Sequence, residues 1–222
     1  MESEALGLRE QSKVARRISI RLFDIVMSFL SVLLLFPLFA AIMIAIKLDD
    51  GGPVFFVQER VGLDGKKFRI LKFRSMVTGA SDMADGHYIN GQNDGRITLV
   101  GRLLRKSSLD ELPQLINILK GEMSLVGPRP GMPFHMAEYT PRQMKRLQVK
   151  PGLTGWAQVN GRNSLSWPER IELDLWYIEH RSMLLNAKVI LRTIPAILRP
   201  EGLYASKEKF CFNTDEKSGI TV

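Results

Sequence analysis

The sequence predicts an α+β fold that is mostly helical, with a re-entrant membrane helix near the N-terminus, amphipathic interfacial helices, a small β-hairpin and one compact domain. Three observations support this fold class. Residues 22–46 are almost entirely apolar but contain Pro37, Asp64-Gly65 separates two runs typical of strands, and apolar residues recur at helical spacing further along. With 45% hydrophobic and 24% charged residues, the composition is that of a globular protein. The single cysteine, Cys211, excludes an intrachain disulfide and favours a reducing compartment.

The chain is basic, because 31 lysines and arginines against 23 aspartates and glutamates give a formal net charge of +8. Such a charge indicates an anionic partner, which the composition leaves open as nucleic acid, anionic lipid or a phosphate-bearing substrate. Many of the basic residues flank the apolar segment: Lys13, Arg16, Arg17 and Arg21 precede it, and Lys47, Arg60, Lys66, Lys67, Arg69, Lys72 and Arg74 follow it.

The apolar segment, residues 22–46, is longer than the roughly 20 residues that cross a bilayer, and Asp24 is its only charge. Membrane insertion is therefore favoured over a buried core helix. Pro37 divides the segment into legs of about 22 Å and 14 Å, each shorter than a hydrocarbon core of about 30 Å. Basic residues at both ends favour a cytoplasmic location for both flanks. A kinked span stays open, but a re-entrant helix bent at Pro37, supported by Ser28 or Ser31, fits better.

The remaining elements follow from turn residues and apolar spacing. Gly121 is the expected C-terminal cap of a short helix, and Pro195 is expected to kink or end the last helix early. That last helix is amphipathic and suits a membrane interface. We expect strands at residues 54–57 and 68–73, a mobile loop at 78–95, turns at 127–130 and 151–155, and helices at 112–119, 141–148, 167–178 and 183–198.

These elements give four segments. They are a basic N-terminal segment at residues 1–21, the re-entrant helix at 22–47, the compact domain at 48–200 and a C-terminal tail at 201–222. The sequence contains no internal repeat, phosphate-binding loop, dinucleotide fingerprint or nucleophile elbow. Its three histidines, His87, His135 and His180, lack the spacing of zinc ligands.

Asp110 and Glu111 are the first candidates for chemistry. Adjacent carboxylates on a helix point about 100° apart, so one could attack a phosphorus centre while the other binds a metal. The structural alternative is a capping box formed by Ser108 and Glu111 at a helix N-terminus. Pro113 fits that box poorly, because a proline there removes an intrahelical bond. Both interpretations stay open at this point.

Basic residues next to rigid turns are the second set of candidates. Arg129 lies between two prolines, Arg162 ends a turn that contains glycine, and Arg105 precedes the acidic pair. Arginines held in this way suit bidentate phosphate binding, although a solvated surface charge is the common alternative. Lys72 and Arg74 lie in a basic and aromatic stretch that suits either nucleic-acid contact or a half-buried strand.

Five longer runs resemble the bacterial sugar transferase family, the monotopic polyprenyl-phosphate phosphoglycosyl transferases. They occur in the family's order between about Arg16 and Arg199, and the chain is similar to the small members of the family. The runs are KFRSM at residues 72–76, DGRIT at 94–98, SLDELPQ at 108–114, KGEMSLVGPRP at 120–130 and PGLTGWAQVNGR at 151–162.

The resemblance implies a reaction. Members of this family transfer a sugar-1-phosphate from a UDP-sugar to undecaprenyl phosphate and release UMP, through a covalent phosphosugar–aspartyl intermediate that starts glycoconjugate assembly. Asp110 would be the nucleophile, Glu111 its partner, and Mg²⁺ would bind at this pair. Pro37 matches the family's helix bend. The residues expected near the phosphates, nucleotide or sugar are Arg105, Arg129, Gln158, Asn160 and Arg162, with Lys72 and Arg74 as further binding candidates.

The resemblance also implies a location at the bacterial inner membrane, with the catalytic domain on the cytoplasmic face. Inner-membrane lipids and downstream glycosyltransferases are expected partners, and nucleic acid is not. Likeness at residues 160–163 and 207–210 suggests an N-acetylated aminosugar. Two other functions stay open: a membrane-anchored adaptor that binds nucleic acid or anionic lipid through its charge, and a metal-dependent phosphohydrolase that acts on a nucleotide sugar.

Overall fold

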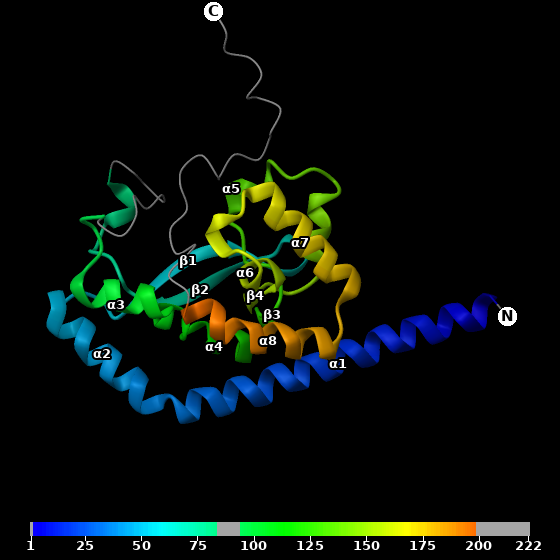
Figure 1. Cartoon of the computed structure of the whole chain (residues 1–222), viewed down its shortest axis with the longest axis horizontal. Coiled ribbons are helices and arrows are strands. Elements are labelled where there is room, and N and C mark those ends of the chain that lie inside the picture. The colour runs from blue at the N-terminus through cyan, green and yellow to red at the C-terminus, as the bar shows by residue number, and fades with distance from the viewer. Residues whose placement is uncertain (1, 84–93, 199–222) are drawn as a thin grey trace, which may run out of the picture.

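The computed structural model describes residues 2–83 and 94–198. Two long helices, α1 (Glu2–Leu34) and α2 (Phe36–Asp50), form the lower edge of the molecule, and the remaining elements pack on one side of them (Figure 1). Most of the expected loop at residues 78–95 and the whole tail at 201–222 lie outside the described residues, as do His87 and Cys211.

Helices α1 and α2 meet at a bend of 61° next to Leu35. Pro37 lies in the first turn of α2, where its missing N–H costs no interior hydrogen bond. The Leu35 amide donates to the Ser31 carbonyl and the Phe39 amide to the Leu35 carbonyl, both at 2.9 Å. The predicted bend at Pro37 is therefore confirmed. Support comes from the backbone of Ser31, whereas the hydroxyl of Ser28 is buried without a partner in the described part of the chain.

No single helix among the described residues is both long and apolar enough to cross a membrane, but the bent pair Val14–Leu34 and Phe36–Asp50 meets both criteria together. Because α1 begins at Glu2, the basic segment at residues 1–21 continues into the apolar segment as one helix. Large apolar side chains on this pair face outward, among them Leu22, Phe29, Leu33, Leu34, Phe36 and Ile44.

Asp24, the charge inside the apolar segment, fixes α1 to the rest of the protein. Its side chain is 2% exposed and accepts hydrogen bonds from the Ser124 hydroxyl at 2.7 Å and the Leu125 amide at 3.0 Å. One turn earlier, Arg21 donates to the Ile118 carbonyl at 2.6 Å. This role could not be predicted from the local sequence, because the partners lie about a hundred residues away.

A β-hairpin packs against α2 through Ile70 and Phe73 of its second strand. Strands β1 (Phe55–Val61) and β2 (Lys67–Phe73) are antiparallel, with Phe55 opposite Phe73 and Val61 opposite Lys67. The connection contains Asp64 at φ 55° and Gly65 at φ 75°, which supports the predicted turn at this dipeptide. The hairpin is confirmed, although β1 extends to Val61, beyond the residues expected.

The main core lies between the hairpin, α2, α3 (Leu99–Ser107) and α4 (Gln114–Lys120). The Asn117 side chain joins α4 to β2, because it accepts from the Leu71 amide at 3.0 Å and donates to the Arg69 carbonyl at 2.8 Å. The buried residues of this core are Phe39, Ile42, Ile46, Ile70, Phe73, Leu104, Leu115, Ile118 and Met123.

A second unit contains the parallel strands β3 (Ser124–Val126) and β4 (Gly152–Thr154), with α6 (Trp156–Val159), α7 (Trp167–His180) and α8 (Met183–Leu198). Helix α7 begins with a capping box in which the Ser166 hydroxyl accepts from the Glu169 amide. Helix α8 lies beside α1, and its buried side packs against α7 and β3 around Val126, Tyr177, Leu185 and Val189 (Figure 1).

Four local predictions need correction. Residues 151–155 contain strand β4, because Gly127 and Gly152 let two backbones approach so closely that a Cβ on Gly152 would lie 2.1 Å from the Gly127 nitrogen. Residues 141–148 form a 3₁₀ helix, Gln143–Gln148, after the short α5 (Pro133–Met136). The helix expected at 112–119 begins only at Gln114, although Gly121 caps it at φ 90° as predicted. Helix α8 continues through Pro195.

Candidate active site

A cavity of about 1020 Å³ lies between the hairpin, the turn after α3, the loop around Arg129 and helices α6 and α8. Its lining combines charged side chains with apolar residues, and most of the residues contributed by α1 and α8 are apolar. The site candidates from the sequence that line it are Lys72, Arg74, Arg105, Asp110, Glu111, Arg129, Gln158 and Arg162.

Asp110 and Glu111 lie on a single 3₁₀ turn, Leu109–Glu111, between α3 and α4. Leu109 and Leu112 pack against the core on either side of the pair, which leaves the two carboxylates facing the cavity. The proposed capping box is wrong. Ser108 adopts a left-handed conformation at φ 57° and makes no side-chain cap, and its hydroxyl instead accepts from Arg162 at 3.1 Å.

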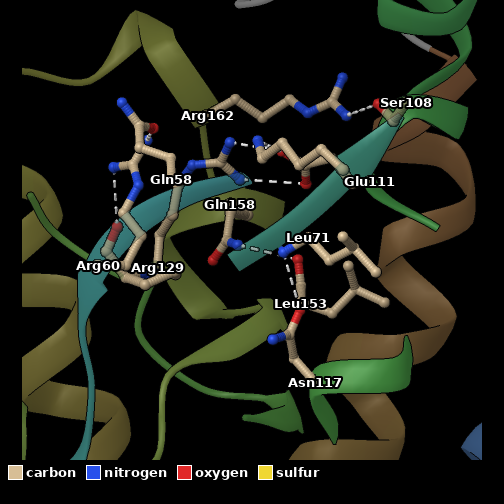
Figure 2. Close-up of polar contacts among 12 residues, drawn as sticks. Gln58, Arg60, Leu71, Ser108, Glu111, Asn117, Arg129, Leu153, Gln158 and Arg162 are labelled. Atoms are coloured by element: carbon tan, nitrogen blue, oxygen red, sulfur yellow. Dashed lines mark hydrogen bonds and ion pairs between the residues drawn. The ribbon is translucent and has the colours of Figure 1, made fainter. Parts of the chain in front are cut away.

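Glu111 is held by two cations (Figure 2). Its Oε1 accepts from Lys72 Nζ at 2.8 Å and from Arg129 Nη2 at 2.6 Å, while Oε2 accepts from Arg129 Nη1 at 3.3 Å. Burial alone would raise the pKa of Glu111, but the charges and hydrogen bonds of Arg129 and Lys72 outweigh it and hold the pKa well below its usual range. Glu111 is therefore a fixed negative charge at neutral pH.

Asp110 is in the opposite situation. Its half-buried carboxylate makes no hydrogen bond or ion pair with any described residue. Burial raises the pKa of Asp110 to about 6, with a further upward contribution from Glu111, against the opposing charges of Lys72, Arg105 and Arg129. Above that pH the group is an unpaired carboxylate that is more basic than an ordinary aspartate, which suits a nucleophile.

The loop that carries Arg129 is fixed through its backbone. The Gly152 amide of β4 donates to the Pro128 carbonyl at 2.9 Å, and Arg146 Nη2 donates to the Arg129 carbonyl at 3.0 Å. Arg146 is itself buried and paired with Asp174 of α7 at 2.7 Å. Since both contacts hold the main chain, the Arg129 guanidinium can bind Glu111. The Arg129 side chain is nevertheless 47% exposed.

Arg60 is a cavity residue that sequence reasoning did not place in the site. Its Nη2 donates to Gln58 Oε1 at 2.7 Å and its Nη1 to the Pro130 carbonyl at 3.3 Å. The alternation of side chains between the two faces of the strand could have indicated that Arg60 belongs to the site. Gln58 and Arg60 share a face with Phe56, whose partner across the hairpin is Lys72, already a candidate.

The glycine-rich C-terminal run contributes two of its three candidates. Arg162 lines the cavity at φ 52°, and Gln158 lines it while donating to the Leu153 carbonyl at 3.3 Å. Buried Arg162 Nη1 and Gln158 Oε1 have no partner among the described residues. Asn160 does not line the cavity. Its exposed side chain donates to the Trp156 carbonyl at 2.7 Å and caps α6.

Arg74 and Arg105 differ in their surroundings. Arg74 lines the cavity but is only 5% exposed, and its guanidinium is paired with the Asp50 carboxylate and bonded to the Pro53 carbonyl. The structure therefore gives Arg74 a structural contact that the sequence did not predict, in which it holds the end of α2 against β2. Arg105 is half-buried in the last turn of α3, and its positive charge acts on Asp110.

The donor set near the acidic pair is compatible with Mg²⁺. The described residues contain no group of three aspartate, glutamate, histidine or cysteine side chains that would form a complete metal cage. Mg²⁺ is commonly held by one or two carboxylates together with substrate phosphates. Asp110 has no competing partner in the described part of the chain, whereas both oxygens of Glu111 already accept from cations. The residues therefore fit a Mg²⁺ ion held largely by its substrate.

Comparison with known families gives one clear match. A family model described as bacterial sugar transferase matches residues 15–200, which include the bend between α1 and α2 and every residue of the cavity described above.

Characterised and uncharacterised relatives have similar sequences. "Uncharacterized sugar transferase EpsL" of Bacillus subtilis is 42% identical over 89% of this chain and 98% of the relative. Exopolysaccharide production protein ExoY of Rhizobium meliloti is 40% identical over 83% of this chain and 87% of the relative. UDP-glucose:undecaprenyl-phosphate glucose-1-phosphate transferase of Escherichia coli is 45% identical over 77% of this chain, which spans 38% of that longer relative.

Proposed function

The chain belongs to the bacterial sugar transferase family, and from that membership we propose that it transfers a sugar-1-phosphate from a UDP-sugar to undecaprenyl phosphate and releases UMP. The observation that carries the proposal is the unpaired carboxylate of Asp110, which faces a cavity lined by several cationic side chains. A diphosphate substrate needs such charges, and a carboxylate that is not bonded to a neighbouring side chain can approach its phosphorus atom.

In the first half-reaction, a carboxylate oxygen of Asp110 attacks the phosphorus atom that carries the sugar. A new bond forms between this oxygen and phosphorus, and the phosphorus–oxygen bond to UMP breaks. UMP leaves with the electron pair, and the enzyme retains a phosphosugar on Asp110. The raised pKa of Asp110 supports this role, because the carboxylate is ionised at neutral pH and still comparatively basic.

In the second half-reaction, a phosphate oxygen of undecaprenyl phosphate attacks the same phosphorus atom. The bond between phosphorus and the Asp110 oxygen breaks, the carboxylate is restored, and a polyprenyl diphosphosugar is released. Neither half-reaction uses water. The phosphosugar intermediate on Asp110 therefore escapes hydrolysis if the lipid acceptor reaches it before water does.

The cations around Asp110 reduce the repulsion between its carboxylate and the diphosphate. Lys72, Arg105 and Arg129 are the positive charges that act on Asp110. Glu111 binds two of them and fixes their positions without itself needing to contact the sugar. Preorganised charges of this kind stabilise the transition state because they need not reorient during the reaction.

Mg²⁺ is the proposed cofactor, with Asp110 and Glu111 as the residues that would hold it. When bound, it would neutralise part of the diphosphate charge and stabilise the departing phosphate. Since Lys72 and Arg129 already occupy the oxygens of Glu111, Asp110 is the more accessible of the two ligands.

The membrane-facing elements support a lipid acceptor. We propose that the bent pair α1–α2 enters and leaves the cytoplasmic leaflet of the bacterial inner membrane, with α8 at the interface. The apolar part of the cavity is lined by Met27 of α1, by Leu35 at the bend, and by Ile190, Ile194 and Ile197 of α8. A path with these walls would let the phosphate of a membrane lipid approach Asp110 while its isoprenoid chain stays in an apolar environment.

The sugar is proposed to be an N-acetylated aminosugar, from the likeness at residues 160–163. Residues 207–210, which share that likeness, lie outside the described part of the chain. Relatives named for galactose and glucose provide the competing candidates, and the exopolysaccharide proteins among the relatives suggest a role at the start of polysaccharide assembly with glycosyltransferases acting next.

The test is UMP release by the purified protein in lipid nanodiscs, using a panel of UDP-sugars with and without undecaprenyl phosphate. Multiple turnovers should require the lipid, and Asp110→Asn should lower the rate by about 10³-fold or more. Glu179→Gln, an exposed acid at the end of α7, is the matched control and should behave as wild type. Sustained UMP release without lipid would favour the phosphohydrolase, and anionic-lipid binding without any turnover would favour the adaptor.

A further inference from the structure

Two arginines of the cavity have no acidic residue as an ion-pair partner in the described part of the chain, although the charge of Glu111 acts on both. Arg60 and Arg162 form no ion pair with any residue in the described ranges 2–83 and 94–198. Each also has a buried guanidinium nitrogen without an acceptor there, Nε in Arg60 and Nη1 in Arg162. Buried cationic donors are costly unless an anion binds them, so this pair points to a ligand that carries negative charge.

These two arginines gather with Arg129 beside Glu111 (Figure 2). Burial and the nearby charge of Arg129 lower the pKa of Arg60 to about 10 and also lower the pKa of Arg162. Asp110 is influenced by a different set, consisting of Lys72, Glu111, Arg105 and Arg129. Arg129 thus belongs to both groups, while Arg60 is bonded to Gln58 and the Pro130 carbonyl and Arg162 to the Ser108 hydroxyl, so neither is paired with the nucleophile.

The chemistry of the proposed reaction suggests a role for these unpaired arginines. In phosphoryl transfer the attacking and leaving oxygens lie roughly in line on opposite sides of phosphorus. UMP therefore leaves on the side opposite Asp110. In the second half-reaction Asp110 is the leaving group, so the phosphate of the acceptor must attack from the position that UMP has vacated.

We propose that Arg60, Arg129 and Arg162 form a single monophosphate subsite that is used twice in each catalytic cycle. It holds the phosphate of UMP while the bond to UMP breaks, and then holds the phosphate of the polyprenyl acceptor while the bond to Asp110 breaks. This inference rests on the proposed function, because it requires both half-reactions to pass through Asp110. It assigns Arg60, a residue that no motif indicated, to direct contact with both substrates.

A structural role for Arg60 is the competing explanation. Its Nη1 donates to the Pro130 carbonyl at 3.3 Å and so helps to hold the loop that carries Arg129. A loop support would act through Arg129, so Arg60→Gln should have no further effect on UMP once Arg129 is replaced by glutamine, whereas a direct phosphate contact would still be lost in that background. UMP and uridine differ only by the phosphate, so comparing them shows whether the loss concerns that group.

The first experiment measures inhibition by UMP and by uridine, using the full chain in nanodiscs. Arg60→Gln should raise the inhibition constant of UMP by about tenfold or more, since a charge-assisted hydrogen bond is lost, and should leave that of uridine unchanged. Arg60→Lys should restore part of the UMP affinity. Arg69→Gln is the matched control, because Arg69 lies on the same hairpin, opposite Glu59, with its side chain exposed.

The second experiment measures the Michaelis constant of the polyprenyl phosphate acceptor in the same variants. Shared use of the subsite predicts that Arg60→Gln and Arg162→Gln raise this constant by a factor similar to that found for UMP. A change for UMP alone, an equal loss for uridine, or wild-type constants in both assays would overturn the inference. The proposed function fails separately, if the wild-type protein releases no UMP from any UDP-sugar.

Discussion

Asp110 and Glu111 are neighbours in sequence but have opposite electrostatic surroundings. Glu111 is bonded to Lys72 and Arg129, whereas Asp110 faces the cavity without a partner among the described residues. In enzymes, two nearby acids whose surroundings give them different pKa values commonly have different roles, one structural and one reactive. This contrast supports the proposal that Asp110 is the nucleophile and that Glu111 positions the neighbouring cations.

The different surroundings of the two acids predict how Glu111→Gln changes the pKa of Asp110. The change removes a negative charge that raises the pKa of Asp110 and frees Lys72 and Arg129 to stabilise its carboxylate, so that pKa should fall below about 6. Carbon-13 NMR of aspartate-labelled, metal-free protein would follow the titration, with Asp110→Asn used to assign the signal. An unchanged or higher pKa for Asp110 in the variant would contradict the electrostatic account.

The site could be predicted from the sequence only in part. Asp110, Glu111 and Arg129 lie in long runs, and the structure brings them together. Arg60 was missed because a single arginine on a strand resembles an ordinary surface charge. Arg74 was expected to bind substrate, but its partner Asp50 comes from a helix that the local sequence does not reveal as a neighbour.

At the scale of elements, Arg74 joins the end of α2 to strand β2. Replacing it with glutamine should leave the Asp50 carboxylate unpaired and lower the free energy of unfolding by about 1–3 kcal/mol. Arg142→Gln is the matched control, because it breaks an ion pair with Glu172 whose side chains are 66% and 54% exposed, and it should cost less than about 1 kcal/mol. Thermal unfolding in detergent measures both variants, and equal losses would contradict a structural role for Arg74.

Elements with strong local signals were predicted correctly. The hairpin has Asp64-Gly65 at its turn, α4 ends at Gly121, and the bend between α1 and α2 adjoins Pro37. Parallel strands β3 and β4 were not predicted, since each has only three residues and pairs with a segment far away in sequence. Pro195 does not end α8 because it lies in the last turn, where little of the helix remains to be disrupted.

At the scale of the whole molecule, the positive charge has two separate locations. One part lies within α1 and α2, before and at the end of the apolar segment, where it suits the surface of a membrane. The other part lines the cavity and includes Arg60, Lys72 and Arg74, which follow that segment in the sequence. The apolar wall formed by α1 and α8 joins these regions, and we propose that it admits the lipid acceptor. Anionic lipid and phosphate substrate are thus both accounted for by one arrangement of helices.

The re-entrant arrangement predicts which side of the membrane each flank occupies. Single cysteines placed at Gln11 in α1 and at Lys66 in the hairpin turn, in a Cys211→Ser background, should both react with an impermeant maleimide from the cytoplasmic side. Both positions are exposed in the structure. Labelling is compared between inverted vesicles, which expose the cytoplasmic side of the membrane, and intact spheroplasts, which expose the opposite side. Reaction of the two positions from opposite sides would contradict a re-entrant helix and indicate a span.

The most direct measurement is the intact mass of the purified protein after incubation with a UDP-sugar in the absence of undecaprenyl phosphate. The proposed mechanism predicts a mass increase that corresponds to one phosphosugar, located on Asp110, absent from Asp110→Asn and removed when the lipid acceptor is added. A protein that turns over UDP-sugar without any covalent adduct, or with the adduct on another residue, would contradict the assignment of Asp110 as the nucleophile.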